Sequence, residues 1–517
     1  SWFIDQYKET GESSIPLFVD GKLPSYIQGD LIRLGPSINH TPDRNYTNFL
    51  DGFGRITKWE IKGKENEVSY HSNLLRSNLY NNSNSAEEIV RHITQQPTQP
   101  KLVAGSFKIE NMDNTDVFLY TYGDTNSPKL VTLTDLAIGN EVDMQTLSTL
   151  GNVDFDDDCE VCKDAIFSGS HYGEWVDPKT NQKNIVNWLG KKTKASFSIM
   201  IYTMNPATRR RRIVGSLSLD WQPYSIHSIA VTGDYAVLVL GRVELNFMET
   251  GMKLCVSCAA HDKLHEEPTL VYVFQLSGES LDIHTQPEMS FEIPKEEAFF
   301  VFHYVNAYIE QVDDSSDLLM IDMCAYTSMD GVLGDYVLGD LHDILTPSIR
   351  NTMPYNCDAL KRMEIDLKKK SLSQIQNLST TGADGFEYRL ELVRINPLYS
   401  GKPACWGYGF TMHVKNSPLY SDMGIAKINL CTTSSDDPGI SNVFHQKNVY
   451  VGEPLFVPDP SQSDVEDAGS LLVVSKNGTS GDTNLLVINA KTMELVASVA
   501  APIPTMFEFH GKFVPFL

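Results

Sequence analysis

Four histidines are the residues of this chain most able to do chemistry, and each lies in a segment that reads as a β-strand. They are His171 in SGSHYGEW, His227 in YSIHSIAV, His303 in FFVFHYVN and His510 in FEFHGKFV. A neutral imidazole is a common metal ligand, and three or four that converge are enough to hold an ion. We therefore predict that these side chains form a metal site, provided that the fold brings them together.

The segments between the histidines predict a β-rich fold. Most of them alternate polar and apolar residues or run apolar between turn signals, as in TLVYVFQLSGES and SDLLMIDMCAY. A large β-rich chain must protect its sheet edges, and a radial propeller of four-stranded blades does so. Seven blades would average about 74 residues each. The histidines lie 56, 76 and 207 residues apart, near one, one and three blades, so all four could meet on the axis.

Few segments predict helices. One candidate covers residues 85–93 (SAEEIVRHI), and another covers residues 356–367 (NCDALKRMEIDL). Neither could organise a helical domain, and no long glycine-, serine- or proline-rich linker divides the chain. We therefore expect a single domain over residues 1–517.

The charge balance excludes one class of partner. Lysine and arginine number 42 against 66 aspartates and glutamates, which gives a formal net charge of −24. Such a field repels phosphate backbones and anionic lipid headgroups, so nucleic acid is not an expected partner. No apolar run approaches the roughly 18 residues that a membrane-spanning helix needs. We expect a soluble protein.

The cysteines leave the cellular compartment open. Eight cysteines are an ordinary number for this length, although the CxxC pairs Cys159/Cys162 and Cys255/Cys258 could each close a local disulfide. We slightly favour a cytoplasmic location, with secretion as the alternative.

Two further clusters contain possible metal ligands, but each also has a simpler structural explanation. Cys255, Cys258, His261 and His265 resemble zinc ligands, but the central gap is far shorter than in a zinc finger, so a loop disulfide or free thiols is expected. The DFDDDCE stretch offers calcium-type oxygens at residues 154–158 without the glycine and final glutamate of an EF-hand loop. An acidic surface loop is expected there.

Several motifs in the same order give the chain a family resemblance along nearly its whole length. They are SIPLFVDGKLPSYIQGDLIRLGPS, NFLDGFGRITKW, FHYVNAYIE, ELVRIN, VGEPLFVP, LLVINAKTMELV and the closing FHGKF. Together they resemble the carotenoid cleavage oxygenases, which include the β-carotene oxygenases and the retinal-pigment-epithelium retinoid isomerase. The resemblance implies an all-β, seven-bladed propeller with a helical and loop dome over one face. It also implies an Fe²⁺ ion on the axis, held by four histidines that match the four above.

The resemblance further implies three outer carboxylates, each bonded to the distal N–H of one iron-bound imidazole. Two match Glu391 and Glu453, but the third position, in LVTLTDLAIGNEVD, holds Asp135. Its shorter side chain would need a closer strand or a bridging water, and losing one such partner would lower metal affinity or activity about 10–100-fold. A second departure follows His171, where the family usually has His-Pro-His and this chain has Tyr172 and a glycine.

Three more positions carry implied roles in binding the cofactor and a polyene. In the family, dioxygen adds across one double bond of a polyene to give two carbonyl products. Thr134 matches a side chain that shields a coordination position of the metal, and Tyr326 and Phe509 match aromatic residues that line the substrate tunnel. Their π faces could stabilise a cationic polyene.

Two functions follow from these expectations. The first is an Fe²⁺-dependent oxygenase that cleaves or isomerises a carotenoid or apocarotenoid with O₂. The alternative is a non-catalytic carotenoid-binding pigment or storage protein on the same scaffold. Animal relatives that draw substrates from bilayers tend to carry an apolar segment at the tunnel mouth, whereas the corresponding residues 92–106 here are polar. We therefore expect membrane contact to be weak or absent. Whether the protein forms a homo-oligomer is left open by the sequence.

Overall fold

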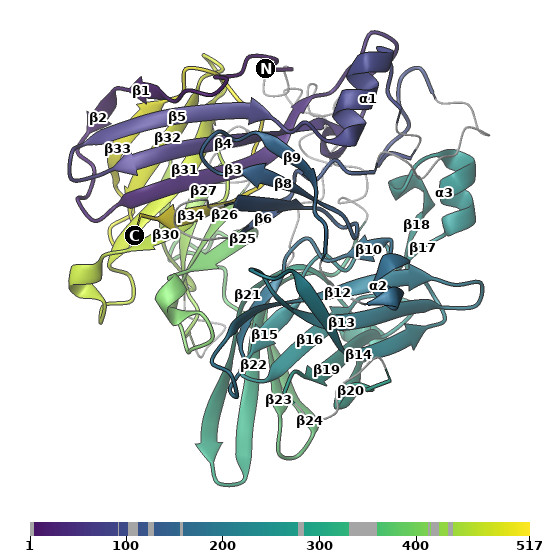
Figure 1. Ribbon diagram of the computed structural model, residues 1–517. Helices are drawn as coiled ribbons and strands as arrows, with labels where there is room; N and C mark the ends of the chain where they lie inside the picture. Colours follow the sequence, from purple (N-terminus) through teal and green to yellow (C-terminus); the bar gives the residue numbers. More distant parts are fainter. Residues whose placement is uncertain are drawn as a thin grey trace.

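The fold is known from a computed structural model that describes most of the chain. The described residues are 5–90, 93–101, 112–122, 129–155, 159–277, 284–329, 359–411, 414, 423–432 and 438–516. Their strands form seven sheets of four to six strands and one two-stranded ribbon. The sheets are the blades of a β-propeller (Figure 1), so the predicted all-β, seven-bladed fold is confirmed.

The first four blades in chain order are antiparallel sheets. The first consists of β1 (Ile15–Leu17), β3 (Gln28–Ile38), β4 (Phe53–Lys62), β5 (Glu67–Leu74) and β34 (His510–Pro515). The second consists of β6 (Phe118–Tyr122), β7 (Lys129–Leu133), β8 (Gly139–Asp143) and β9 (Thr149–Asn152). The third consists of β10 (Phe167–Ser168), β11 (Gly173–Val176), β12 (Lys183–Lys192), β13 (Phe197–Asn205) and β14 (Arg210–Leu219). The fourth consists of β15 (Ala230–Thr232), β16 (Tyr235–Leu240), β19 (Thr269–Gln275) and β20 (Met289–Ile293).

Three blades complete the ring. The fifth consists of β21 (Phe300–Asp313), β22 (Ser316–Tyr326), β23 (Ala359–Asp366) and β24 (Ser371–Leu378). The sixth consists of β25 (Leu390–Ile395), β26 (Trp406–Thr411), β27 (Gly424–Asn429) and β28 (Ile440–His445). The seventh consists of β2 (Val19–Gly21), β29 (Val449–Val451), β30 (Leu455–Pro458), β31 (Gly469–Asn477), β32 (Thr483–Asn489) and β33 (Leu495–Ala500).

Short helices and one ribbon lie outside the blades. The ribbon is β17 (Val243–Leu245) with β18 (Ala260–Asp262), and the α-helices are α1 (Asn78–Ala86), α2 (Glu160–Lys163) and α3 (Phe247–Lys253). Within the described ranges, 3-10 turns cover Phe49–Asp51, Ser257–Ala259, Lys295–Glu297, Pro397–Tyr399 and Pro460–Gln462. None of the helices in the described part of the chain is long and apolar enough to cross a membrane.

Strand exchange between the first and last blades closes the ring. Strand β34 pairs with β3, with Leu34 opposite His510, and β2 pairs with β33. The purple N-terminal strands therefore lie beside the yellow C-terminal ones (Figure 1). Apolar side chains then pack the blades together, as where Tyr408 of β26, Phe456 of β30 and Leu471 of β31 share one buried cluster.

The first predicted helix lies earlier in the chain than expected. Helix α1 begins after Ser77, whose hydroxyl accepts a hydrogen bond from the Tyr80 amide, and ends at Glu87, which is left-handed with φ 56°. The Asp113 carboxylate also accepts bonds from the first amides of the helix. The expected helix was therefore wrong over residues 87–90, because these caps fix the helix over an earlier and more polar stretch; residues 91 and 92 lie outside the described residues.

The second predicted helix is wrong in type, since residues 359–366 of it form strand β23; residues 356–358 lie outside the described residues. Arg362 lies opposite Asp322 of β22 and makes two hydrogen bonds to its carboxylate, at 2.6 and 2.7 Å. Leu360, Met363 and Ile365 are buried between blades. Pairing with the neighbouring strand outweighs the helical propensity of this short segment.

Ring closure gives a prediction about Gly511 of β34. A Cβ at this position would lie 2.4 Å from the Ile32 carbonyl oxygen and 2.5 Å from Cδ of Arg33. We expect Gly511→Ala to destabilise the fold by about 1–3 kcal/mol through overpacking. The control is Gly251→Ala in α3, where a Cβ meets nothing within 4 Å and should stabilise by up to about 1 kcal/mol. Thermal unfolding of both variants checks this; equal melting temperatures would contradict it.

Candidate metal centre

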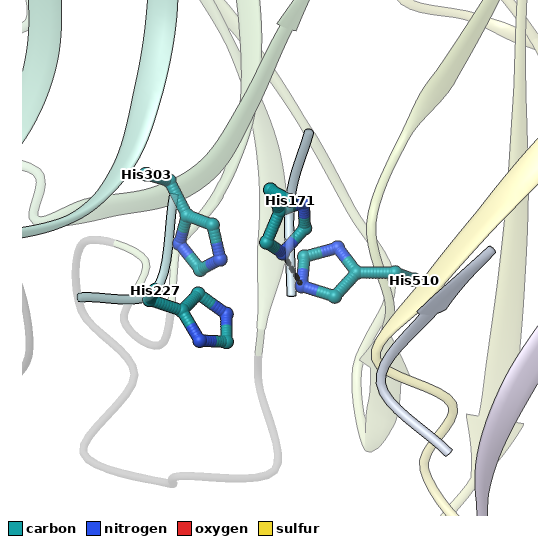
Figure 2. A group of neighbouring side chains, drawn as sticks. All are labelled: His171, His227, His303 and His510. Carbon is teal, nitrogen blue, oxygen red and sulfur yellow. Dashed lines mark hydrogen bonds between the residues drawn. The ribbon is translucent and has the colours of Figure 1, made fainter. Parts of the chain in front are cut away.

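The four predicted histidines come from segments of four different blades, and their rings lie close together (Figure 2). His303 lies in β21 and His510 begins β34, as predicted. His171 lies between β10 and β11, and His227 lies just before β15, so these two were wrongly assigned to strands. Their segments are nevertheless paired, because the His171 amide donates to the His227 carbonyl at 3.0 Å.

The four rings face one another closely. One ring nitrogen from each lies within 4.8 Å of the others, and Nε2 of His171 is 3.1 Å from Nε2 of His510. Ring centroids of neighbouring pairs lie 4.2–5.1 Å apart. This arrangement directs four nitrogen donors at a common point.

Three of the rings are oriented from behind by carboxylates. Nδ1 of His227 lies 2.8 Å from Asp135, Nδ1 of His303 lies 2.7 Å from Glu391, and Nδ1 of His510 lies 3.0 Å from Glu453. A carboxylate at Nδ1 keeps the proton on that nitrogen and leaves the lone pair of Nε2 facing the centre.

Asp135 reaches its histidine directly despite its shorter side chain. Besides His227, its carboxylate accepts hydrogen bonds from the hydroxyls of Ser170 and Ser225, the latter at 2.8 Å. Burial acts to raise the pKa of Asp135, but the attraction of His227 and these hydrogen bonds outweigh it and lower the pKa to about 2. No bridging water is needed, and neither serine was anticipated from the sequence.

Glu391 is held by the tyrosine that was expected only to line a tunnel. The Tyr326 hydroxyl donates to Oε1 of Glu391, and the Leu392 amide donates to Oε2 at 2.6 Å. Burial opposes ionisation, yet the attraction of His303 and the hydrogen bonds lower the pKa of Glu391. Tyr326 therefore contributes to the orientation of His303 through Glu391.

Glu453 is paired with two arginines that the sequence analysis did not single out. Arg33 lies 3.2 Å from Oε2 and is as fully buried as Glu453 itself, and Nε of Arg394 lies 2.6 Å from Oε1. Burial opposes ionisation of Glu453, but Arg394, His510 and Arg33 together lower its pKa. Both arginines lie in the quoted motifs LIRLGPS and ELVRIN, which was the available signal.

His171 is the histidine without a carboxylate partner among the described residues. Its ring packs on Phe118, with centroids 4.3 Å apart, and the next residue, Tyr172, bonds Nζ of Lys512 at 3.1 Å. Burial first, and then the neighbouring histidines, lower the pKa of His171 well below its usual range. The ring is therefore neutral at physiological pH, as a metal ligand must be.

The donor set fits a divalent transition metal. Nε2 of His303 is buried and has no hydrogen-bond partner in the described part of the protein, which is costly unless another ligand satisfies it. Four neutral imidazoles suit Fe²⁺ as well as Zn²⁺, Co²⁺ or Cu²⁺. The residues present therefore fit the group that the sequence implies.

A cavity of about 330 Å³ opens onto the histidines. His227, His303 and His510 lie in its wall, and most of the remaining lining is apolar. Thr134, Tyr326 and Phe509 also line it. Phe509 packs against Phe49 with centroids 4.8 Å apart, so aromatic rings form part of the wall near the centre.

The other clusters do not form a second metal site in the described residues. Cys255 and Cys258 form a disulfide. This removes both thiolates that a zinc site would require, and it confirms the expected loop disulfide. Of the acidic stretch 154–158, residues 156–158 lie outside the described residues, as do residue 92 and residues 102–106 of the polar segment 92–106.

The fold and the four-histidine centre define a class, and comparison with known proteins identifies it. The model of the family described as retinal pigment epithelial membrane protein matches residues 3–515. Chloroplastic carotenoid cleavage dioxygenase 8 of Arabidopsis thaliana is 22% identical over 96% of this chain and 83% of its own length. The β,β-carotene 15,15′-dioxygenase of Mus musculus is 24% identical over 96% of this chain and 88% of its own length.

A solved structure agrees with the fold. Cobalt-substituted Synechocystis apocarotenoid oxygenase superposes with a TM-score of 0.78 and 19% identity, covering 99% of this chain and 97% of that one. The chain belongs to the retinal pigment epithelial membrane protein family, the carotenoid cleavage oxygenases, as its motifs predicted.

The buried charge pair at Glu453 gives a stability prediction. Glu453→Ala leaves Arg33 buried without its carboxylate, which should cost roughly 3–5 kcal/mol. Glu391→Ala strands no buried cation and should cost about 1–3 kcal/mol through unsatisfied hydrogen bonds. Melting temperatures measured in a chelator separate this effect from metal loss. A Glu391→Ala variant as unstable as Glu453→Ala would contradict the pairing.

Proposed function

We propose that this protein is an Fe²⁺-dependent oxygenase that cleaves or isomerises the polyene chain of a carotenoid or apocarotenoid, using O₂. The observation that carries the proposal is the convergence of four imidazoles, three of which lie in the wall of a mostly apolar cavity. Family membership and the carotenoid dioxygenases among the relatives support the substrate class.

The metal would be held by His171, His227, His303 and His510. When bound, Fe²⁺ with four protein ligands keeps open positions and supplies the capacity to activate dioxygen. Asp135, Glu391 and Glu453 hold three of the imidazoles in the tautomer that presents Nε2.

The cavity residues would select and orient the polyene. Thr134 lies in the wall beside Asp135, where it can restrict access to one side of the centre. The rings of Phe509 and Phe49 offer π faces to an extended apolar chain and to positive charge that develops along it. The apolar wall also excludes water from the reacting double bond.

The pigment-binding alternative loses one of its four supports. It drew on Asp135, on the changed neighbours of His171, on the acidic composition and on the polar segment 92–106. Asp135 bonds His227 directly at 2.8 Å, as an outer glutamate is expected to do, so this replacement no longer favours the pigment. The carotenoid dioxygenases among the relatives favour catalysis over storage.

The function is tested with the purified protein loaded anaerobically with Fe²⁺. Wild type and the control His265→Ala, an exposed histidine outside the cluster, should hold one iron per chain. Each should convert β-carotene or an apocarotenal in detergent micelles to aldehyde, ketone or isomer products by mass spectrometry. His303→Ala should lose most of its iron and all of this activity. A stoichiometric carotenoid absorption band that persists in air in iron-loaded wild type would instead favour the binder.

We further propose that the protein matures in an oxidising compartment, the alternative to the cytoplasmic location favoured at first. Disulfides join Cys159 to Cys162, Cys255 to Cys258 and Cys405 to Cys431. Such bonds are rare in reducing cytosol. Cys405–Cys431 closes the end of the β26–β27 hairpin across 26 residues, so it contributes to the stability of one blade.

Thiol labelling of the unfolded protein tests the compartment proposal. Without reductant, the six cysteines of the three disulfides should stay unlabelled, and after reduction they should react. The double variant Cys405→Ser/Cys431→Ser should lose about 3 kcal/mol, because a 26-residue loop is released. The control is Cys159→Ser/Cys162→Ser, which should cost less stability because that disulfide closes a loop of only four residues. Labelling of all eight cysteines in protein isolated from its natural source would contradict the proposal.

A further inference from the structure

Asp135 differs from the two outer glutamates because each of its two carboxylate oxygens accepts a hydrogen bond from a serine hydroxyl. Oδ1 accepts from Nδ1 of His227 and from the Ser170 hydroxyl, and Oδ2 accepts from the Ser225 hydroxyl at 2.8 Å. Among the described residues Glu391 and Glu453 bind no serine; their other partners there are a tyrosine, backbone amides and two arginines.

The two serines belong to the segments that carry two of the histidines. Ser170 directly precedes His171 and is fully buried, and Ser225 lies two residues before His227. Backbone bonds join the same segments, since the Ser168 amide donates to the Asp135 carbonyl at 3.1 Å and the His171 amide donates to the His227 carbonyl. One carboxylate thus contacts both ligand-bearing segments.

This arrangement bears on both differences between the chain and the family pattern, namely the aspartate at position 135 and the changed neighbours of His171. An aspartate is one methylene shorter than a glutamate, so its carboxylate stays near the backbone of its own segment, where short hydroxyl side chains can reach it. His171 has no carboxylate partner of its own among the described residues, yet its neighbour Ser170 is bonded to Asp135. The two hydroxyls thus satisfy both oxygens of the shorter carboxylate.

We infer that Asp135, Ser170 and Ser225 form a clamp that fixes the His171 and His227 segments relative to each other, with both serines as positioning residues of the metal centre. The clamp rests on the proposed metal-dependent function and explains how aspartate serves there. About 38% of the Asp135 side chain remains accessible. Because Asp135 lines the internal cavity, the clamp lies at the surface that a substrate would meet.

The clamp predicts how metal affinity responds to the hydroxyls. The probe is Co²⁺ titrated into metal-free protein and followed by its ligand-field absorption, with no substrate present. Ser170→Ala/Ser225→Ala should weaken Co²⁺ binding about 10–100-fold, and each single variant should lose part of this. Ser225→Thr, which keeps a hydroxyl, should bind almost as tightly as wild type. Ser316→Ala, which removes a 2.8 Å serine bond to Asp366 away from the site, is the matched control and should not change affinity.

Lengthening the side chain at position 135 from aspartate to glutamate gives a readout that a general loss of stability would not produce. In the wild-type background Asp135→Glu should weaken Co²⁺ binding, because the extra methylene competes with the two hydroxyls. In the Ser170→Ala/Ser225→Ala background the same change should restore much of the lost affinity. Asp135→Glu would thus lower the Co²⁺ affinity in one background and raise it in the other. Such a reversal is the energetic coupling expected between residues in contact.

The outcomes separate the clamp from the function on which it rests. Wild type that binds no Co²⁺ would overturn the four-histidine centre, and the clamp with it. Wild type that binds Co²⁺ while the double-alanine variant binds equally well would overturn the clamp alone. If the double variant unfolds, the single variants and Asp135→Glu decide: unchanged affinity in all three overturns the clamp.

Discussion

The pairing of β34 with β3 is the interaction on which the rest of the structure depends. It joins the two ends of the described chain, closes the ring of blades and places His510 opposite Leu34 at the axis. Inner segments of other blades then supply the remaining imidazoles. A site assembled from four blades exists only when every blade between them is packed, so the centre depends on the cooperativity of the whole fold.

Charge balance is the second constraint at the axis. Four neutral rings leave a divalent ion with its full charge, and burying that charge is costly unless opposite charges lie nearby. Three carboxylates surround the rings, and two arginines offset one of them. The shell therefore carries a small net negative charge that complements a cation.

Much of this could be predicted from sequence, because ligands and their partners lie within motifs that are continuous in the chain. The histidines, Glu391 and Glu453 are of this kind. Arg33, Ser170 and Ser225 were missed, since their roles depend on contacts between segments far apart in sequence. The helix predicted over residues 356–367 failed for a related reason: Arg362 pairs with Asp322 across a sheet, and no local pattern records that partner.

The order of the ligands along the chain has a consequence for biosynthesis. His171, His227 and His303 are translated well before His510, which belongs to the strand that completes the first blade only after the seventh has been made. A nascent chain on the ribosome thus holds an incomplete coordination set. The complete four-nitrogen set forms only after the final strand has been translated and paired, so the last step of folding also completes the metal centre.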